Sequence, residues 1–187
     1  MVIAREPKPD VERIQTLAQR IVAGDILLPQ FQRDFVWSRA QVLELLDSIS
    51  QNYPIGSILL WLSKQRLRSE RSIADLPLTE RPEEYPVNYL LDGQQRLSTI
   101  CGALFWKAQE GGEESIWNIA YDLREKKFVH LSSLGDPHLH QVRTNKLFDA
   151  TVFFKHVAAL DTLGASDKEE LKAEAERLFA IFRDYSI

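Results

Sequence analysis

Apolar residues recur every three or four positions in five stretches of the chain, a spacing that puts them on one face of a helix. The first stretch stops before Gly24, and glycine commonly follows the end of a helix. The second follows Ser38 and Gln41, which have the spacing of a capping box. The sequence therefore predicts five helices with these inner faces: Val11, Ile14, Leu17 and Ile21; Val42, Leu45, Leu46 and Ile49; Leu97, Ile100, Cys101, Leu104, Phe105 and Ala108; Phe153, His156, Val157 and Leu160; Leu171, Ala175, Leu178, Phe179, Phe182 and Tyr185.

Two further signals set the expected ends of the later helices. The third helix would end at Gly111-Gly112. Ser166 and Glu169 are spaced as a second capping box, so the fifth helix would begin there. We expect it to run to the last residue, Ile187.

Short apolar runs predict the strands. The run "DILLPQ" at 25–30 is a short strand ended by its proline, and "VNYLLD" at 87–92 is another. The run "IGSILLWL" at 55–62 is apolar almost throughout, which is usual when both faces of a strand are covered. We therefore expect this strand at the centre of the sheet.

A hairpin and two irregular segments complete this outline. The stretch "SIWNIAYDLREKKFVHL" predicts a β-hairpin that pairs Ile116–Tyr121 with Phe128–Leu131. Residues 64–86 are charged and contain three prolines, which favours a long surface loop with at most one short helical turn. Residues 132–146 are expected to be irregular.

The order of these elements favours an α+β fold, in which a small mixed sheet is flanked by helices. A chain of 187 residues with 44% hydrophobic composition is large enough to bury a core. We expect one domain at 1–146 and a helical extension at 147–187 that leads toward a missing or separate C-terminal domain. The oligomeric state is open, and an oligomer is compatible with the sequence.

Composition narrows the cellular setting. No apolar run approaches the roughly 20 residues of a membrane span, and the charged N-terminal stretch lacks the apolar centre of a signal peptide. We therefore expect a cytoplasmic protein without a membrane partner. The one cysteine, Cys101, cannot form an internal disulfide and lies at an apolar helical position, so we expect a buried packing group.

The most informative polar stretch is Asp92-Gly-Gln-Gln-Arg96, between a predicted strand and a predicted helix. The first N–H groups of a helix lack intrahelical partners and attract anions. Gly93 allows a ligand to approach the backbone, Gln94 and Gln95 offer amides, and Arg96 has a planar fork suited to phosphate. These residue types favour a cradle for nucleotide phosphates.

Asp92 leaves two interpretations open. Beside phosphates its carboxylate would need a cation, and Mg²⁺ bridging Asp92 to the phosphates would serve. Alternatively, Asp92 caps the helix and Arg96 pairs with a nearby acid. In "LPQFQRDFVW", Gln32 and Arg33 offer a second phosphate contact, although Arg33 would also fit over an aromatic ring. Trp37 adjoins this loop and could border a base.

Two other polar clusters are weaker candidates. In "KQRLRSER", the basic residues Lys64, Arg66, Arg68 and Arg71 suit contact with DNA phosphates, or a solvated charged surface. The net charge of −4 argues against a protein that coats nucleic acid indiscriminately. His138 and His140 lack a convincing third ligand for a metal.

Three motifs in order, "LPQFQRDFVW", "YPIGSILLW" and "YLLDGQQRLSTI", resemble the N-terminal domain of the DGQQR family, also described as domain of unknown function 262. That family occurs in GmrSD-type and phosphorothioation-dependent restriction proteins of phage defence, and the matching region is 10–131. It is similar in turn to the ParB N-terminal and sulfiredoxin fold, in which a Gly-x-x-Arg turn holds nucleotide phosphates. The ParB/sulfiredoxin-like fold is thus what the resemblance implies.

The resemblance also implies a function. It implies a regulatory domain that binds and hydrolyses a nucleoside triphosphate with Mg²⁺, and a nuclease on a C-terminal domain or separate subunit that cuts modified DNA. The residues carried over are Asp92, Gln94 and Gln95 for catalysis, and Gln32, Arg33, Gly93, Gln94, Gln95 and Arg96 for the nucleotide. No His-Asn-His nuclease pattern occurs in this chain. The alternatives are a DNA-binding sensor without catalysis, or a DNA-nicking domain that uses Asp92 as a metal ligand.

Overall fold

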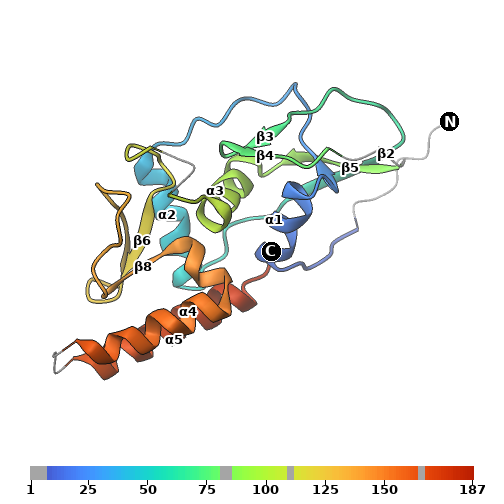
Figure 1. Cartoon of the computed structure of the whole chain (residues 1–187). Helices are drawn as coiled ribbons and strands as arrows, with labels where there is room; N and C mark the ends of the chain where they lie inside the picture. The colour runs from blue at the N-terminus through green and yellow to red at the C-terminus, as the bar shows by residue number, and fades with distance from the viewer. Residues whose placement is uncertain (1–7, 81–85, 109–111, 164–166) are drawn as a thin grey trace.

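The computed structural model describes residues 8–80, 86–108, 112–163 and 167–187, coloured along the chain in Figure 1. The predicted helix signals Gly111 and Ser166 lie outside the described residues. The elements are α1 (Ile14–Val22), β1 (Ile26–Leu27), α2 (Arg39–Ser50), β2 (Leu59–Ser63), β3 (Ser72–Ile73), β4 (Leu76–Pro77), β5 (Val87–Asp92), α3 (Gln94–Phe105), β6 (Ile119–Asp122), β7 (Lys127–His130), β8 (Gln141–Arg143), η1 (Thr144–Phe148), α4 (Ala150–Ala159), η2 (Leu160–Thr162) and α5 (Lys168–Asp184).

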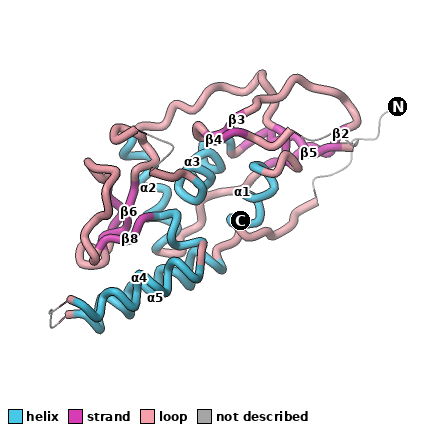
Figure 2. Tube along the Cα trace, in the orientation of Figure 1, coloured by secondary structure: helices cyan, strands magenta, loops and turns pink. Residues whose placement is uncertain are grey.

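These elements form the mixed α+β fold that the sequence predicts. One sheet has the order β1-β5-β2, in which β1 is parallel to β5 and β2 is antiparallel to it. A second sheet has the order β7-β6-β8 and is antiparallel, and β3 and β4 form a small hairpin. Figure 2 shows the two larger sheets at opposite ends of the molecule, with α3 between them.

Helix α3 is the centre of the core because its side chains from Leu97 to Leu104 are all buried. Gly102 lets the Trp117 ring lie directly on the helix, since a Cβ there would come within 2.3 Å of the ring. Cys101 is buried, as expected of a packing group, and burial raises the pKa of its thiol. The N-terminal end of α3 is therefore held rigidly by tertiary packing.

Local signals predict several elements correctly. Ser38 and Gln41 form the reciprocal capping box at the start of α2, and the predicted inner face of that helix is buried. The hairpin has the expected pairing, with Tyr121 opposite Phe128. Helices α4 and α5 pack through stacked rings of Phe153 and Phe179, whose centroids are 4.5 Å apart. Within the described segments, no helix combines the length and the apolar character needed to cross a membrane.

The prediction that "IGSILLWL" forms the central strand is wrong. The central strand is β5, which pairs with β1 on one side and with β2 on the other. β2 is an edge strand, and its side chains Leu59 and Leu62 are 46% and 60% exposed. An apolar run shows that a segment suits a strand, but it does not show how many neighbours cover that strand.

The predicted ends of three helices also need correction. Val11 is exposed and precedes α1. α3 ends at Phe105, because Trp106 adopts an extended backbone and buries its ring. α5 ends at Asp184 instead of continuing to Ile187, because the last residues hydrogen-bond with the segment before α1: Glu12 N–H to Ile187 O at 3.1 Å and Ile187 N–H to Glu12 O at 3.0 Å.

Two segments expected to be irregular contain strands. The described part of 64–86 forms β3 and β4 rather than a helical turn, and Ala74 and Asp75 between them have positive φ angles. β8 lies within 132–146 and pairs with β6, so that Val142 faces Tyr121. These three strands are only two or three residues long, which gives them too little sequence pattern to recognise.

Candidate functional site

The junction of β5 and α3 requires a glycine. Gly93 has a φ of 99°, in the left-handed region that other residues avoid. It is also buried, and a Cβ there would lie 2.3 Å from Cδ1 of Ile58. Because Gly93 is the N-cap and has no side chain, no side-chain cap covers the first N–H groups of α3. This leaves the positive end of the helix dipole available to an anion.

A cavity of about 540 Å³ lies at this helix end. Its walls come from the 31–37 loop, the end of β5 and the first turn of α3. The lining residues are Phe31, Gln32, Arg33, Trp37, Leu91, Asp92, Gly93, Gln94, Gln95 and Arg96. The fold therefore brings together every residue of the two stretches that the sequence singles out for nucleotide binding, although they are about 60 positions apart.

Two glutamines fasten the 31–37 loop to the sheet and helix. Gln95 is buried, its Oε1 accepts from Val36 N–H at 2.9 Å, and its Nε2 donates to Asp34 O at 2.9 Å. Nε2 of Gln32 donates to Leu90 O in β5. Both polar atoms of the Gln95 amide thus bond to the loop backbone, which gives this side chain a positioning role.

Gln94 has the opposite property. Its side-chain Oε1 is buried and has no hydrogen-bond partner among the described residues. An unpaired buried acceptor is costly and uncommon, so such an atom indicates a missing partner. A ligand N–H, a bound water or a cation at the cavity would each satisfy it.

Arg96 is held in the wall of the cavity by two contacts. Its Nη1 donates to Ile55 O at 2.9 Å, and its Nη2 donates to Oδ2 of Asp92 at 3.0 Å. The Arg96 side chain is 19% exposed, whereas that of Asp92 is 68% exposed. Arg96 thus pairs with an acid, as the second interpretation of the motif expects, but Asp92 is that acid and does not cap α3, whose N-cap is Gly93. The N–H groups of the guanidinium that these contacts do not use remain for an anion.

Arg33 supplies the second positive charge of the cavity. Its side chain is exposed, and it makes no hydrogen bond or ion pair with another described residue. The neighbouring Phe35 is committed to the core, where its ring lies 5.1 Å from that of Trp117. Phe31 is 69% exposed and also lines the cavity, which is unusual for a large apolar side chain.

The cavity suits a divalent cation only together with its ligand. Among the described residues, no cluster of three or more His, Cys, Asp or Glu side chains is arranged to hold a metal. Asp92 is the one carboxylate among the cavity-lining residues, and Oε1 of Gln94 is a second oxygen. Mg²⁺ is typically bound by one or two protein oxygens, phosphates and water, so this donor set fits Mg²⁺ that arrives with a nucleotide.

Gly56 is a site residue that the sequence interpretation missed. Its φ is 91°, and a Cβ there would lie 2.3 Å from Nη1 of Arg96. It therefore leaves room for the guanidinium, just as Gly93 leaves room for the helix start. The signal was present as the glycine in "YPIGSILLW", but its partner is 40 positions away along the chain.

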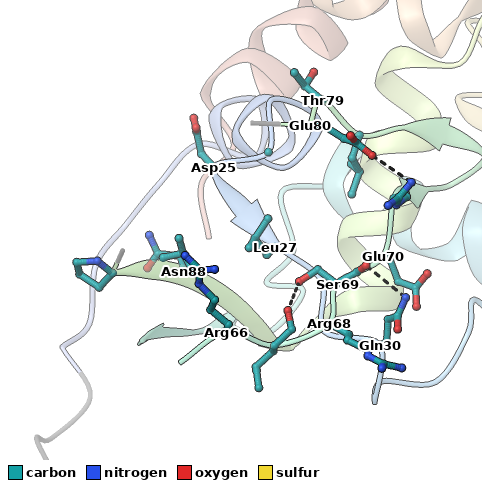
Figure 3. Close-up of a pocket in the computed structure, with 16 residues that line it drawn as sticks. Asp25, Leu27, Gln30, Arg66, Arg68, Ser69, Glu70, Thr79, Glu80 and Asn88 are labelled. Carbon is teal, nitrogen blue, oxygen red and sulfur yellow. Dashed lines mark hydrogen bonds and ion pairs between the residues drawn. The ribbon is translucent and has the colours of Figure 1, made fainter. Parts of the chain in front are cut away.

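A second cavity is larger, at about 1110 Å³, and borders β1 and β5. Arg66, Arg68 and Arg71 of the predicted DNA-contacting segment line it, whereas Lys64 does not. Figure 3 shows Asp25 and Glu80 across this cavity from Arg66 and Arg68. The lining thus contains as many acidic residues as arginines, so it carries no excess positive charge. The acidic residues are Asp25, Glu70 and Glu80.

The predicted histidine pair lies away from both cavities. The rings of His138 and His140 stack with centroids 5.3 Å apart. His140 Nε2 lies 3.6 Å from Oδ2 of Asp122, whose carboxylate already accepts from Gln141 Nε2 at 3.0 Å. Through these contacts, both histidines pack next to the start of β8.

A model of the GmrSD restriction endonuclease N-terminal domain matches residues 14–186. The chain belongs to this family. The match includes α4 and α5 and so extends well beyond the 10–131 region of the sequence motifs. This GmrSD-type domain is also 31% identical, over 104 residues, to the uncharacterized protein MJ0686 of Methanocaldococcus jannaschii. That alignment covers 51% of this chain and only 17% of the relative.

Proposed function

We propose that this domain binds a nucleoside triphosphate with Mg²⁺ in the 540 Å³ cavity, hydrolyses it, and thereby regulates a nuclease that cuts modified DNA. The nuclease would be a further domain or a separate subunit, in keeping with the restriction endonuclease family of the chain. One observation carries the proposal: an uncapped helix N-terminus borders a cavity lined by Arg33, Arg96 and Gln94, whose buried Oε1 has no partner among the described residues.

The phosphates would lie against the first turn of α3. Residues Gly93–Arg96 of this turn line the cavity, and Arg96 and Arg33 add positive charge from two different elements. Asp92 opposes this charge, because its exposed carboxylate lines the same cavity. Asp92 would hold Mg²⁺, whose charge would offset this repulsion, so binding should require the metal.

The base would lie at the aromatic side of the cavity. Phe31 is largely exposed there and Trp37 is partly exposed, and both line the cavity. Stacking on aromatic rings tolerates any base, because every base has a π-face. This arrangement favours a nucleotide over inorganic phosphate alone.

Hydrolysis would divide the roles of the two adjacent glutamines. Gln94 is suited to orient the attacking water, since its Oε1 is buried and unpaired beside the helix start. Gln95 would act only by holding the 31–37 loop and therefore Arg33. Arg33 and Arg96 would stabilise the charge that develops on the transferred phosphoryl group.

The direct test is calorimetric titration of wild type with each of the four ribonucleoside triphosphates and Mg²⁺, followed by hydrolysis assays. Arg96→Ala should weaken binding about tenfold to hundredfold, the range for a charged hydrogen bond. Arg71→Ala is the control, since Arg71 lies in the other cavity and its ion pair with Glu80 is exposed on both sides. Equal binding by wild type and Arg96→Ala would refute the proposal.

A DNA contact through the larger cavity is a second candidate. Three arginines from one short segment, Arg66, Arg68 and Arg71, line it. Phosphate contacts would make DNA affinity fall steeply with added salt, and this dependence should weaken in Arg68→Ala but remain in Arg96→Ala. DNA binding with the same salt dependence in Arg68→Ala would remove this candidate.

A further inference from the structure

The segment between α2 and β2 forms the outer support of Arg96. Ile55 accepts the 2.9 Å hydrogen bond from Nη1, and Gly56 provides the space for the same nitrogen. The position of the guanidinium relative to the cavity therefore depends on where residues 53–56 lie. No other described backbone group accepts from Nη1.

Tyr185, immediately after α5, holds this segment from the other side. Its side chain is buried, and its hydroxyl donates to Tyr53 O at 2.5 Å. Burial raises the pKa of this hydroxyl, and a hydrogen bond from the Ile55 backbone partly opposes that rise. Tyr53, which Tyr185 binds, is two residues before Ile55, whose carbonyl oxygen binds Arg96.

Tyr185 is itself fixed in place by backbone contacts. Its N–H donates to Ile181 O at 2.8 Å in α5, and its carbonyl accepts from Ile14 N–H at 3.1 Å at the start of α1. Arg177 of α5 also donates from Nη1 to Ser50 O at 2.8 Å, at the end of α2. The connection from α2 to Arg96 is therefore tied to α5 at two points.

We propose that Tyr185 is a positioning residue for the nucleotide cavity, which sets the place of the Arg96 guanidinium by holding residues 53–55 through the Tyr53 carbonyl, and so couples the end of α5 to ligand binding. The proposal rests on the function proposed above. Coupling between two sites is reciprocal, so a nucleotide in the cavity must also change the surroundings of the Tyr185 hydroxyl. Removing that hydroxyl leaves the Tyr53 carbonyl without its partner, and the segment then relaxes away from Arg96.

The test compares two tyrosine variants that lose similar hydroxyls. Tyr185→Phe removes the contact with residues 53–55 and keeps the ring. Tyr89→Phe is the matched control: the Tyr89 hydroxyl likewise binds the backbone, donating to Gln65 O at 2.9 Å and accepting from Leu67 N–H at 3.0 Å, but it faces the loop of the larger cavity. Loss of one buried tyrosine hydroxyl should lower the unfolding temperature similarly in both.

Two readouts separate positioning from general stability. Affinity for Mg²⁺-nucleotide should fall about threefold to tenfold in Tyr185→Phe and stay within twofold of wild type in Tyr89→Phe, as expected for one hydrogen bond. In protein without ligand, the ¹⁵N signals of the Arg96 guanidinium should shift in Tyr185→Phe and not in Tyr89→Phe. Unchanged affinity together with unchanged Arg96 signals in Tyr185→Phe would overturn the inference.

The NMR measurement also distinguishes this inference from the proposed function. If wild type binds no nucleoside triphosphate, the proposed function fails, whereas the Arg96 signals still test whether Tyr185 positions the guanidinium. If Tyr185→Phe does not fold, Gly56→Ala serves instead, because its Cβ displaces Nη1 directly. Its control is Gly24→Ala, which imposes similar strain at a φ of 79° beside the larger cavity. Because the coupling is reciprocal, displacing Nη1 should shift the Tyr185 ring signals in Gly56→Ala and not in Gly24→Ala, and unshifted Tyr185 signals in Gly56→Ala would overturn the inference.

Discussion

The two cavities of this domain differ in how their charged groups are held. In the larger one, Arg71 and Glu80 form an ion pair in which both side chains are largely exposed, so it contributes little to stability or to a fixed geometry. In the smaller one, Arg96 is mostly buried and bonded on two sides. The smaller cavity thus has the more fixed geometry of the two, although its volume is smaller.

The same contrast applies to the backbone. The smaller cavity is built on a strand and a helix of the core, and its shape requires glycine at positions 56 and 93. The larger cavity is bordered by a long connection whose strands β3 and β4 are two residues each. A ligand that needs several groups in fixed positions is therefore better served by the smaller cavity.

Substituting Gly93, at the smaller cavity, should have the largest effect on stability and on binding. Gly93→Ala forces a side chain into the left-handed region and against Ile58, so we expect a loss of about 2–4 kcal/mol in the free energy of unfolding and no measurable nucleotide binding. Urea unfolding measures the first effect and calorimetry the second. Gly112→Ala is the control, since a Cβ there meets nothing within 4 Å. A Gly93→Ala protein of wild-type stability would contradict the described turn.

A smaller effect is expected at Gln95. Gln95→Ala leaves Val36 N–H and Asp34 O without partners, which should lower the free energy of unfolding by about 1–3 kcal/mol and loosen the 31–37 loop. Hydrogen exchange of the Val36 amide should become faster. Gln95→Glu keeps an acceptor for Val36 and loses the donor to Asp34, so its Val36 exchange should remain slower than in Gln95→Ala. Equal exchange of this amide in wild type and Gln95→Ala would contradict the hydrogen bond between Val36 and Gln95.

Substituting Arg33 should weaken nucleotide binding in the smaller cavity without affecting the fold. Its side chain is exposed and unpaired among the described residues, so Arg33→Ala should leave the free energy of unfolding within about 0.5 kcal/mol of wild type. Nucleotide affinity should still fall, by about fivefold to twentyfold, and depend less on salt. Titrations at two salt concentrations measure both. Unaltered affinity would exclude Arg33 from the phosphate site.

The smallest effect is expected in the larger cavity. Arg68→Ala should change nucleotide affinity by less than twofold, because Arg68 does not line the smaller cavity. The same calorimetric titration measures it. A fall as large as that in Arg96→Ala would mean that the nucleotide lies in the larger cavity, and the comparison would be reversed.

The sequence predicted those parts of the fold that depend on neighbours along the chain. The capping box of Ser38 and Gln41 and the hairpin around Tyr121 rest on contacts within a few residues. The order of strands depends instead on pairing between distant segments. The edge position of β2 and the short strand β8 therefore could not be read from an apolar run alone.

The candidate site was predictable as a set of residues but not as a set of contacts. The motif at 92–96 and the loop with Gln32 and Arg33 do line one cavity. Sequence alone gave no reason to assign Gln95 to the loop backbone and Gln94 to the cavity, because both are glutamines at a helix start. The support of Arg96 by Gly56 was missed because it joins segments far apart in sequence.

The most direct test of the central claim is to locate a bound triphosphate by NMR. ¹⁵N-labelled wild type would be titrated with a non-hydrolysable nucleoside triphosphate and Mg²⁺. The account predicts that the largest amide shifts fall on Gly93–Arg96 and on Arg33, with little change at residues 66–71. Shifts confined to residues 66–71, or no shifts at a saturating nucleotide concentration, would contradict it.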